Sequence, residues 1–139
     1  ELDRVIAYGH TWSPHLELQP DKPMFHGHGI SVDMAFSATI AEQRGLLSVE
    51  DRDRVLGLMS GLGLSIDSTY LTGELLEKAT DSIVRTRGGF LRAAVPHPIG
   101  SCLFLNDLTV PELDKVLGVH RELCQGYPRA GLGEGMWTP

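Results

Sequence analysis

The sequence predicts a mainly α-helical fold with one small β-hairpin. Apolar residues recur at helical spacing along most of the chain, and Ser or Thr stands before several of these segments, where a helix N-terminus needs a hydrogen-bond acceptor. Short apolar runs around proline and glycine occur at about residues 90–105, a pattern typical of a hairpin. The chain has 139 residues, 42% hydrophobic and 22% charged, which suits one globular domain with a single core.

The first third of the chain combines a broken segment with a buried helix. Residues 1–9 are expected to end a helix or a short strand. Residues 10–29 are expected to form a loop, because prolines and glycines interrupt every regular pattern there, and four of the six histidines lie in it. Residues 30–45 are apolar on all sides, which predicts a buried helix that ends at Gly45.

Three further helices are predicted from their first residues. Ser48 with Asp51 three positions later begins one helix, and Thr72 begins the next, which Gly88 and Gly89 end. A capping box and a first-turn proline begin the last helix at Thr109. The glycine-rich tail after this helix is expected to be irregular.

Composition excludes several classes of partner. The net charge of −6 argues against a nucleic-acid-binding surface, which needs a basic patch. No apolar run reaches the roughly 18 residues of a membrane-spanning helix. Cys102 and Cys124 lack the spacing of a metal motif and are expected to be reduced thiols. We therefore expect a cytoplasmic protein that binds neither nucleic acid nor membrane.

Histidines are the first candidates for chemistry. Neutral imidazole binds zinc, and a catalytic zinc site usually has three protein ligands and one open position. His10 and His26 lie sixteen residues apart on either side of a proline-rich segment, not at the helical spacing of a zincin pair. On spacing alone, either side chain is better explained as a loop histidine bonded to backbone than as a metal ligand. A metal role requires the two rings to lie close together.

The neighbours of these histidines form a recognisable motif. Residues 9–14 read Gly-His-Thr-Trp-Ser-Pro, and residues 26–29 read His-Gly-His-Gly. The two elements resemble the 3-dehydroquinate synthase superfamily of sugar phosphate cyclases, in which a Gly-His element precedes a His-Gly-Glu element by the same interval. Residues 87–102 resemble the family's late basic motif and its hairpin. The likeness covers nearly the whole chain, but only the C-terminal half of a family member.

The resemblance implies a divided active site. Residues 1–139 would form the multi-helical, metal-binding C-terminal domain of the dehydroquinate synthase-like fold, with His10 and His26 as ligands of a divalent zinc or cobalt ion. The NAD-binding N-terminal domain and a third ligand, a glutamate, would lie outside this chain. The sequence opens at Glu1 inside an apolar element, so we expect a fragment of a longer protein. The resemblance also implies that the full-length protein is a homodimer.

Three departures from 3-dehydroquinate synthase indicate a branch. Pro14 replaces a second active-site histidine, His28 replaces the glutamate after His-Gly, and Asp3 stands where that enzyme has a substrate-binding arginine. Loss of the arginine suits a substrate without a carboxylate. The pattern is similar to the cyclases of sedoheptulose 7-phosphate, which form 2-epi-5-epi-valiolone or desmethyl-4-deoxygadusol.

The same resemblance suggests the lining of a substrate pocket. Asp3, Pro14 and His28 would line it, and Arg85 or Arg87 would face the phosphate. Each has an ordinary structural explanation as well: a charged helix end for Asp3, a stiffened loop for Pro14 and a polar helix start for His28. Arg85 and Arg87 would equally suit a helix C-terminus, where cations are favourable.

The implied reaction is a cycle at one site. NAD oxidises a hydroxyl transiently, phosphate leaves by elimination, the ketone is reduced again and an intramolecular aldol step closes the carbocycle. The isolated chain is expected to be inactive and to bind zinc weakly. Two alternatives are 3-dehydroquinate synthase itself and a non-catalytic helical remnant. A third, the iron-type alcohol dehydrogenases, usually has closer histidine spacing on a helix.

Overall fold

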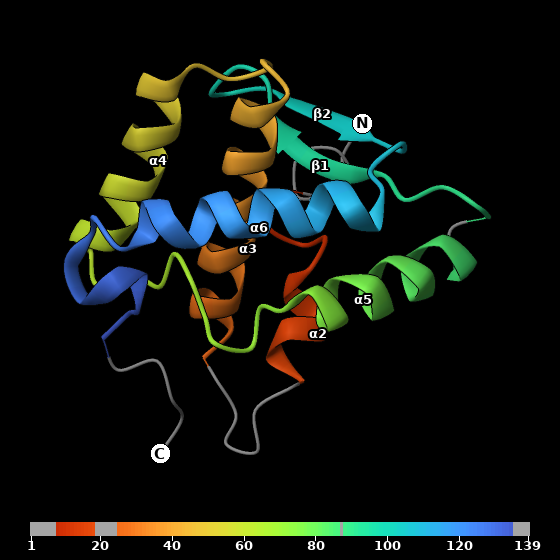
Figure 1. The fold of residues 1–139 in the computed structure, drawn as a ribbon, viewed down its shortest axis with the longest axis horizontal. Helices are drawn as coiled ribbons and strands as arrows, with labels where there is room; N and C mark the ends of the chain where they lie inside the picture. Colours follow the sequence, from red (N-terminus) through yellow and green to blue (C-terminus); the bar gives the residue numbers. More distant parts are fainter. Residues whose placement is uncertain (1–7, 19–24, 87, 135–139) are drawn as a thin grey trace.

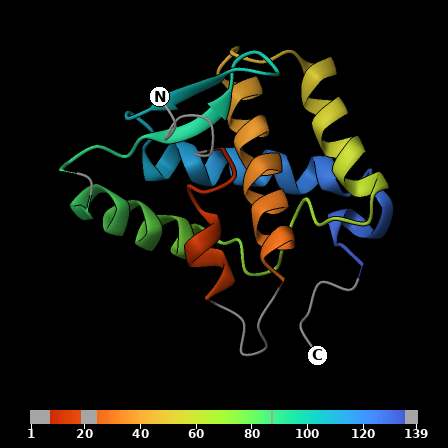
Figure 2. The same cartoon turned by 180° about the vertical axis from the view of Figure 1, so that it is seen from behind.

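The fold is built around one central helix, α3 (His26–Gln43). A computed structural model describes residues 8–18, 25–86 and 88–134 of the chain. In it, α3 packs against α2 (Ser13–Glu17), α4 (Val49–Gly61), α6 (Val110–Cys124) and strand β1 (Ala93–Pro96) (Figures 1 and 2). Residues on every side of α3 are buried, so the prediction of a helix enclosed by protein is confirmed.

The loop predicted for residues 10–29 is wrong at both ends. Its first part contains the short helix α2, and α3 begins at His26 rather than at residue 30. Pro14 lies in the first turn of α2, where its missing N–H group costs nothing. The glycines of the His-Gly-His-Gly segment lie in the first turn of α3, where tertiary packing outweighs their low helix propensity.

The predicted helix starts are confirmed by their caps. Ser48 Oγ accepts the Asp51 backbone N–H at 3.1 Å before α4. Thr72 Oγ1 accepts the Leu75 backbone N–H at 3.1 Å before α5 (Gly73–Thr86). Thr109 Oγ1 accepts the Glu112 backbone N–H at 3.3 Å before α6. These caps need only residues adjacent in sequence, which is why the sequence locates them.

The hairpin predicted at about residues 90–105 is also confirmed. Strands β1 and β2 (Cys102–Leu105) pair antiparallel, with Ala93 opposite Leu105 and Pro96 opposite Cys102. The residues of β1 are buried against α3, whereas β2 lies on the outer side. The two cysteines are free thiols, as expected.

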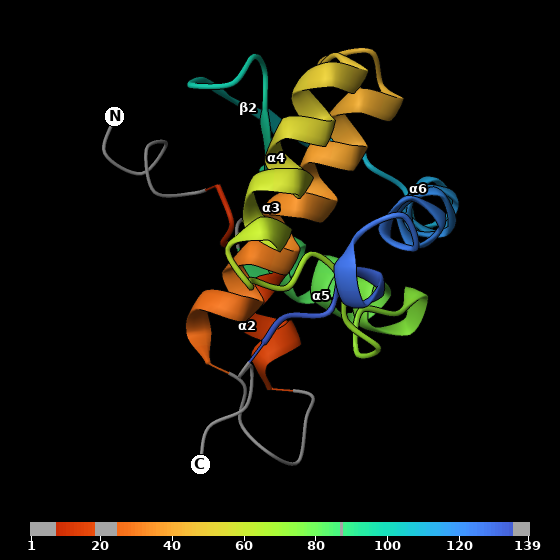
Figure 3. The same ribbon diagram turned by 90° about the vertical axis from the view of Figure 1, so that its left-hand side faces the viewer.

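Helix α6 crosses α3 and closes the core on one side. With α6 seen end-on, α3 and α4 lie side by side and α6 covers their flank (Figure 3). Helix α5 packs against α6, and a short 3₁₀ turn, η1 (Pro128–Gly131), follows α6 and touches α4. Arg44, just after α3, donates to both carboxylate oxygens of Glu112 at 2.7 Å and so ties the end of α3 to the start of α6.

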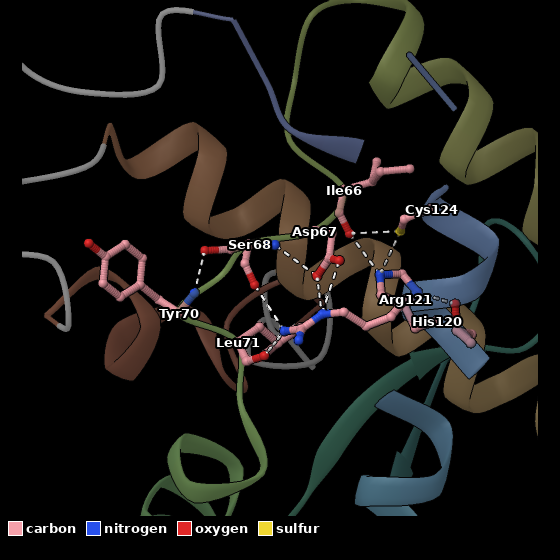
Figure 4. Close-up of polar contacts among 9 residues, drawn as sticks. Ile66, Asp67, Ser68, Tyr70, Leu71, His120, Arg121 and Cys124 are labelled. Carbon is pink, nitrogen blue, oxygen red and sulfur yellow. Dashed lines mark hydrogen bonds and ion pairs between the residues drawn. The ribbon is translucent and has the colours of Figure 1, made fainter. Parts of the chain in front are cut away.

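A buried polar network fastens the segment between α4 and α5 to α6 (Figure 4). His120 Nε2 lies 2.7 Å from the Ile66 carbonyl oxygen, and His120 Nδ1 lies 2.7 Å from Thr39 Oγ1 on α3. Arg121 pairs with Asp67 at 3.2 Å. One α6 histidine therefore links three segments of the core. Among the described residues, no helix combines the length and hydrophobicity that crossing a membrane requires.

This network predicts that the protein loses stability below neutral pH. Burial lowers the pKa of His120 below its ordinary value of 6.5. The folded state holds the neutral ring, whereas the unfolded chain takes up a proton near pH 6.5, so the stabilisation is complete above that pH and is lost as the pH falls. Urea unfolding at several pH values should show a steeper loss of unfolding free energy below pH 6.5 in the wild type than in His120→Gln. Equal slopes would contradict the assignment.

Candidate metal centre

The turn that carries His10 is shaped by Gly9. Gly9 has a φ of +90°, which side-chain-bearing residues rarely adopt. A Cβ atom on Gly9 would lie 2.8 Å from Ile30 Cγ2 and 2.9 Å from Met34 Cγ, both on α3. The glycine therefore lets the chain approach α3 closely, and this approach brings His10 to the first turn of that helix.

The residues after His10 are held by a buried carboxylate. The backbone N–H of Ser13 donates to Asp33 Oδ2 at 2.9 Å, and the backbone N–H of Trp12 donates to the same oxygen. Ser37 Oγ donates to Asp33 Oδ1 at 3.1 Å. Burial raises the pKa of Asp33 to about 6 despite these three hydrogen bonds. Asp33 therefore fixes the His10 loop to α3, together with the fully buried Trp12 ring, which packs edge-on against Phe36 at 6.4 Å.

Substitution of Gly9 by alanine is expected to weaken this attachment. The new methyl group must move Ile30 or Met34, and the positive φ adds strain of about 1–3 kcal/mol. We expect a lower thermal midpoint together with weaker metal binding, because His10 follows directly. Gly45→Ala is a matched control, since Gly45 also has positive φ but no atom lies within 4 Å of its added Cβ. Loss of metal affinity in the Gly45 variant alone would contradict the role of close packing at Gly9.

The structure brings His10 and His26 together. Their ring centroids lie 5.8 Å apart and their planes are tilted by 57°. Two imidazoles that bind one zinc ion at tetrahedral geometry have centroids about 5 Å apart, since each zinc–nitrogen bond is about 2 Å long. Both histidines are exposed: His10 lies three residues before α2, and His26 is the first residue of α3. The two rings therefore fit two positions of one divalent metal site.

A carboxylate contacts one histidine of this pair. Glu17 Oε1, at the end of α2, lies 2.7 Å from His26 Nδ1. Within the described part of the chain, no three His, Cys, Asp or Glu side chains are grouped so that they could hold a metal ion by themselves. A metal bound by His10 and His26 would take its other ligands from outside these residues.

We compared the sequence with models of known protein families. Residues 1–84 match the model of the 3-dehydroquinate synthase C-terminal domain. The chain belongs to the 3-dehydroquinate synthase family. Both histidines of the pair and the buried Asp33 lie within the matched residues.

Two relatives of this chain are synthases with other names. The chain is 61% identical over 133 residues to the demethyl-4-deoxygadusol synthase of Trichormus variabilis, covering 96% of the chain and 32% of that protein. It is 40% identical over 124 residues to a 2-epi-5-epi-valiolone synthase of Actinoplanes, covering 89% of the chain and 31% of that protein. The chain thus spans about a third of the length of these relatives.

A solved structure agrees with the fold. The 2-epi-5-epi-valiolone synthase ValA of Streptomyces hygroscopicus subsp. jinggangensis 5008, with NAD⁺ and Zn²⁺ bound, matches with a TM-score of 0.79 at 32% identity. The match covers 88% of this chain and 34% of that chain. The prediction of a mainly helical, dehydroquinate synthase-like domain with one small hairpin is confirmed.

The other residues predicted to line the substrate pocket lie in different parts of the chain. Pro14 is exposed and lies four residues after His10, at the start of α2. Arg85 is exposed in the last turn of α5. Asp3 and Arg87 lie outside the described residues.

His28 is not brought to the pair. Its buried ring lies 3.0 Å from Ser65 Oγ, and its Nδ1 accepts the Ser65 backbone N–H at 3.2 Å. Two positions along an α-helix rotate a side chain by about 200°, so His26 and His28 project from opposite sides of α3. In this chain His28 anchors the first turn of α3 to the segment before α5.

Two residues of the site were missed from the sequence. Asp33 could have been found, because it is the only charged residue of residues 30–41, a segment otherwise made of apolar and small residues. Glu17 gave no comparable signal, because residues 10–29 were assigned to a loop and its position opposite His26 depends on α2.

Proposed function

We propose that this chain is the metal-binding C-terminal part of a sugar phosphate cyclase that converts sedoheptulose 7-phosphate to demethyl-4-deoxygadusol, with NAD and zinc as cofactors. Residues 1–139 would form the metal-binding domain, and the NAD-binding domain would lie upstream of them. The observation that carries the proposal is that the His10 and His26 ring centroids lie 5.8 Å apart, close to the about 5 Å expected for two imidazoles on one zinc ion. The identity of 61% to a demethyl-4-deoxygadusol synthase, against 40% to a 2-epi-5-epi-valiolone synthase, supports the choice of product.

The proposed division of work follows from the chain's own side chains. His10 and His26 would hold the metal, which when bound polarises substrate oxygens while NAD supplies the redox step. Asp33 and Gly9 hold the His10 loop against α3, so the ligand is positioned before the metal arrives. Pro14 would shape the pocket beside His10, and either Arg85 or Arg87 would pair with the phosphate. Asp3 would lie near the substrate, in place of a carboxylate-binding cation.

Product analysis tests this function. The complete enzyme, incubated with sedoheptulose 7-phosphate, NAD⁺ and Zn²⁺, is expected to yield demethyl-4-deoxygadusol by NMR. The precursor of dehydroquinate should not be turned over in a parallel assay. Formation of 2-epi-5-epi-valiolone would assign the protein to the other cyclase of the branch, and the reverse substrate preference would assign it to 3-dehydroquinate synthase.

The proposal includes the assembly and the location of the complete protein. We propose a homodimer in the cytoplasm, as the family resemblance implies. The 139-residue chain alone should turn over no sedoheptulose 7-phosphate, because the nucleotide-binding domain and a third metal ligand would be missing. Turnover by this chain alone would contradict the divided active site.

A further inference from the structure

We infer that Glu17 is a positioning residue for the metal site: its carboxylate orients the His26 ring, and Gly29 leaves the space that the carboxylate occupies. This inference rests on the proposed metal site. It concerns residues that neither the motif nor the histidine spacing indicated.

The contact between Glu17 and His26 selects one form of the imidazole. Glu17 Oε1 lies 2.7 Å from His26 Nδ1. An ionised carboxylate can only accept, so Nδ1 carries the proton and donates it. The other ring nitrogen, Nε2, then keeps its lone pair free for a metal ion. Carboxylates that accept from a metal-binding histidine in this way fix the ring's orientation and raise its basicity.

The exposure of the two side chains fits this arrangement. The His26 side chain is 63% exposed, whereas the Glu17 side chain is 20% exposed. The carboxylate therefore lies on the protein side of the ring, with the imidazole toward the outside. A chance ion pair on the surface would leave both side chains largely in water.

Gly29 provides room for the Glu17 side chain. A Cβ atom on Gly29 would lie 2.7 Å from Glu17 Cγ, closer than real Cβ contacts, and 3.1 Å from Glu17 Cδ, which is also tight. The backbone of Gly29 is helical and does not need glycine, which is a poorer helix former than alanine. At Gly27, by contrast, no atom lies within 4 Å of an added Cβ. Space for Glu17 is thus the physical reason for glycine at position 29.

Helix α2 connects the two proposed ligands through this contact. Its N-terminal end follows His10 and is held by Asp33, and its C-terminal residue, Glu17, bonds His26. A single rigid turn of helix thereby sets the separation of the two imidazoles. This explains why they converge although sixteen residues separate them in sequence.

Zinc affinity of the complete enzyme tests the inference without relying on activity. Zinc dissociation constants would be measured by competition with a chromophoric chelator for the wild type, Glu17→Ala, Glu17→Gln, Gly29→Ala and the Glu17→Ala/Gly29→Ala double variant. We expect Glu17→Ala to weaken zinc binding by about 10–100-fold. Glu17→Gln should lose less, since the Gln oxygen can still accept from Nδ1. Gly29→Ala should weaken binding in the wild-type background but add nothing in the double variant.

Controls separate this role from general damage. Glu77→Ala removes an exposed carboxylate from α5, and Gly118→Ala adds a methyl group to α6 where no atom lies within 4 Å. Both should bind zinc as the wild type does, and thermal melts should show all variants folded. A Glu17→Ala affinity within twofold of the wild type would overturn the inference, as would equal losses in Glu17→Gln and Glu17→Ala. A wild-type enzyme that binds no zinc would instead overturn the proposed function itself.

Discussion

Replacement of His26 by alanine is expected to remove the metal from the complete enzyme and to abolish most of its turnover. His26 supplies one of only two imidazoles that converge in the described part of the chain, with ring centroids 5.8 Å apart. A catalytic zinc site usually has only three protein ligands, so the loss of one of them should release the ion. Metal analysis after dialysis, together with a turnover assay on sedoheptulose 7-phosphate, measures both effects. His10→Ala should behave in the same way.

A histidine elsewhere on the surface provides the control. His97 is exposed in the hairpin turn and its Nδ1 contacts the Leu46 carbonyl oxygen, away from α2. His97→Ala should therefore retain the metal and the activity. If His26→Ala still held one full equivalent of metal, the assignment of His26 as a ligand would be wrong, and the cyclase proposal would lose its main structural support.

Replacement of Asp33 by alanine is expected to destabilise the protein and to weaken metal binding together. The change leaves the backbone N–H groups of Trp12 and Ser13 buried without an acceptor, at a cost of about 1–3 kcal/mol for each group. Because these residues follow His10 directly, the loop that carries this ligand should also loosen. Urea unfolding measures the first effect, and chelator competition measures the second.

The Asp33→Asn variant distinguishes the hydrogen bonding of the side chain from its negative charge. In Asp33→Asn the amide oxygen can still accept both backbone N–H groups, and the amide nitrogen can donate to Ser37 Oγ. We expect this variant to lie much closer to the wild type than Asp33→Ala in both measurements. Asp81→Ala, which removes an exposed carboxylate from α5, should change neither. Equal damage by asparagine and alanine would show that the negative charge, not the hydrogen bonding, is what the site requires.

Most secondary structure could be predicted from the sequence because its signals are local. Ser48, Thr72 and Thr109 cap helices through side-chain contacts with residues three positions later. The apolar periodicity of α3 and the broken apolar runs of the hairpin are likewise readable in short windows. The failure came in residues 10–29, where proline and glycine are poor helix formers on average, but packing against α3 stabilises α2 and the first turn of α3.

By itself, the sequence determined the helical class, the hairpin and the two histidines of the family motif. Only the tertiary structure decided which side chains meet: it placed His10 beside His26, turned His28 toward Ser65, and set Glu17 and Asp33 behind the proposed ligands. The physical reason is the distance along the chain over which each kind of interaction acts. Caps and periodicity depend on neighbours within a few residues, whereas the convergence of side chains 9 to 37 residues apart depends on how whole helices pack.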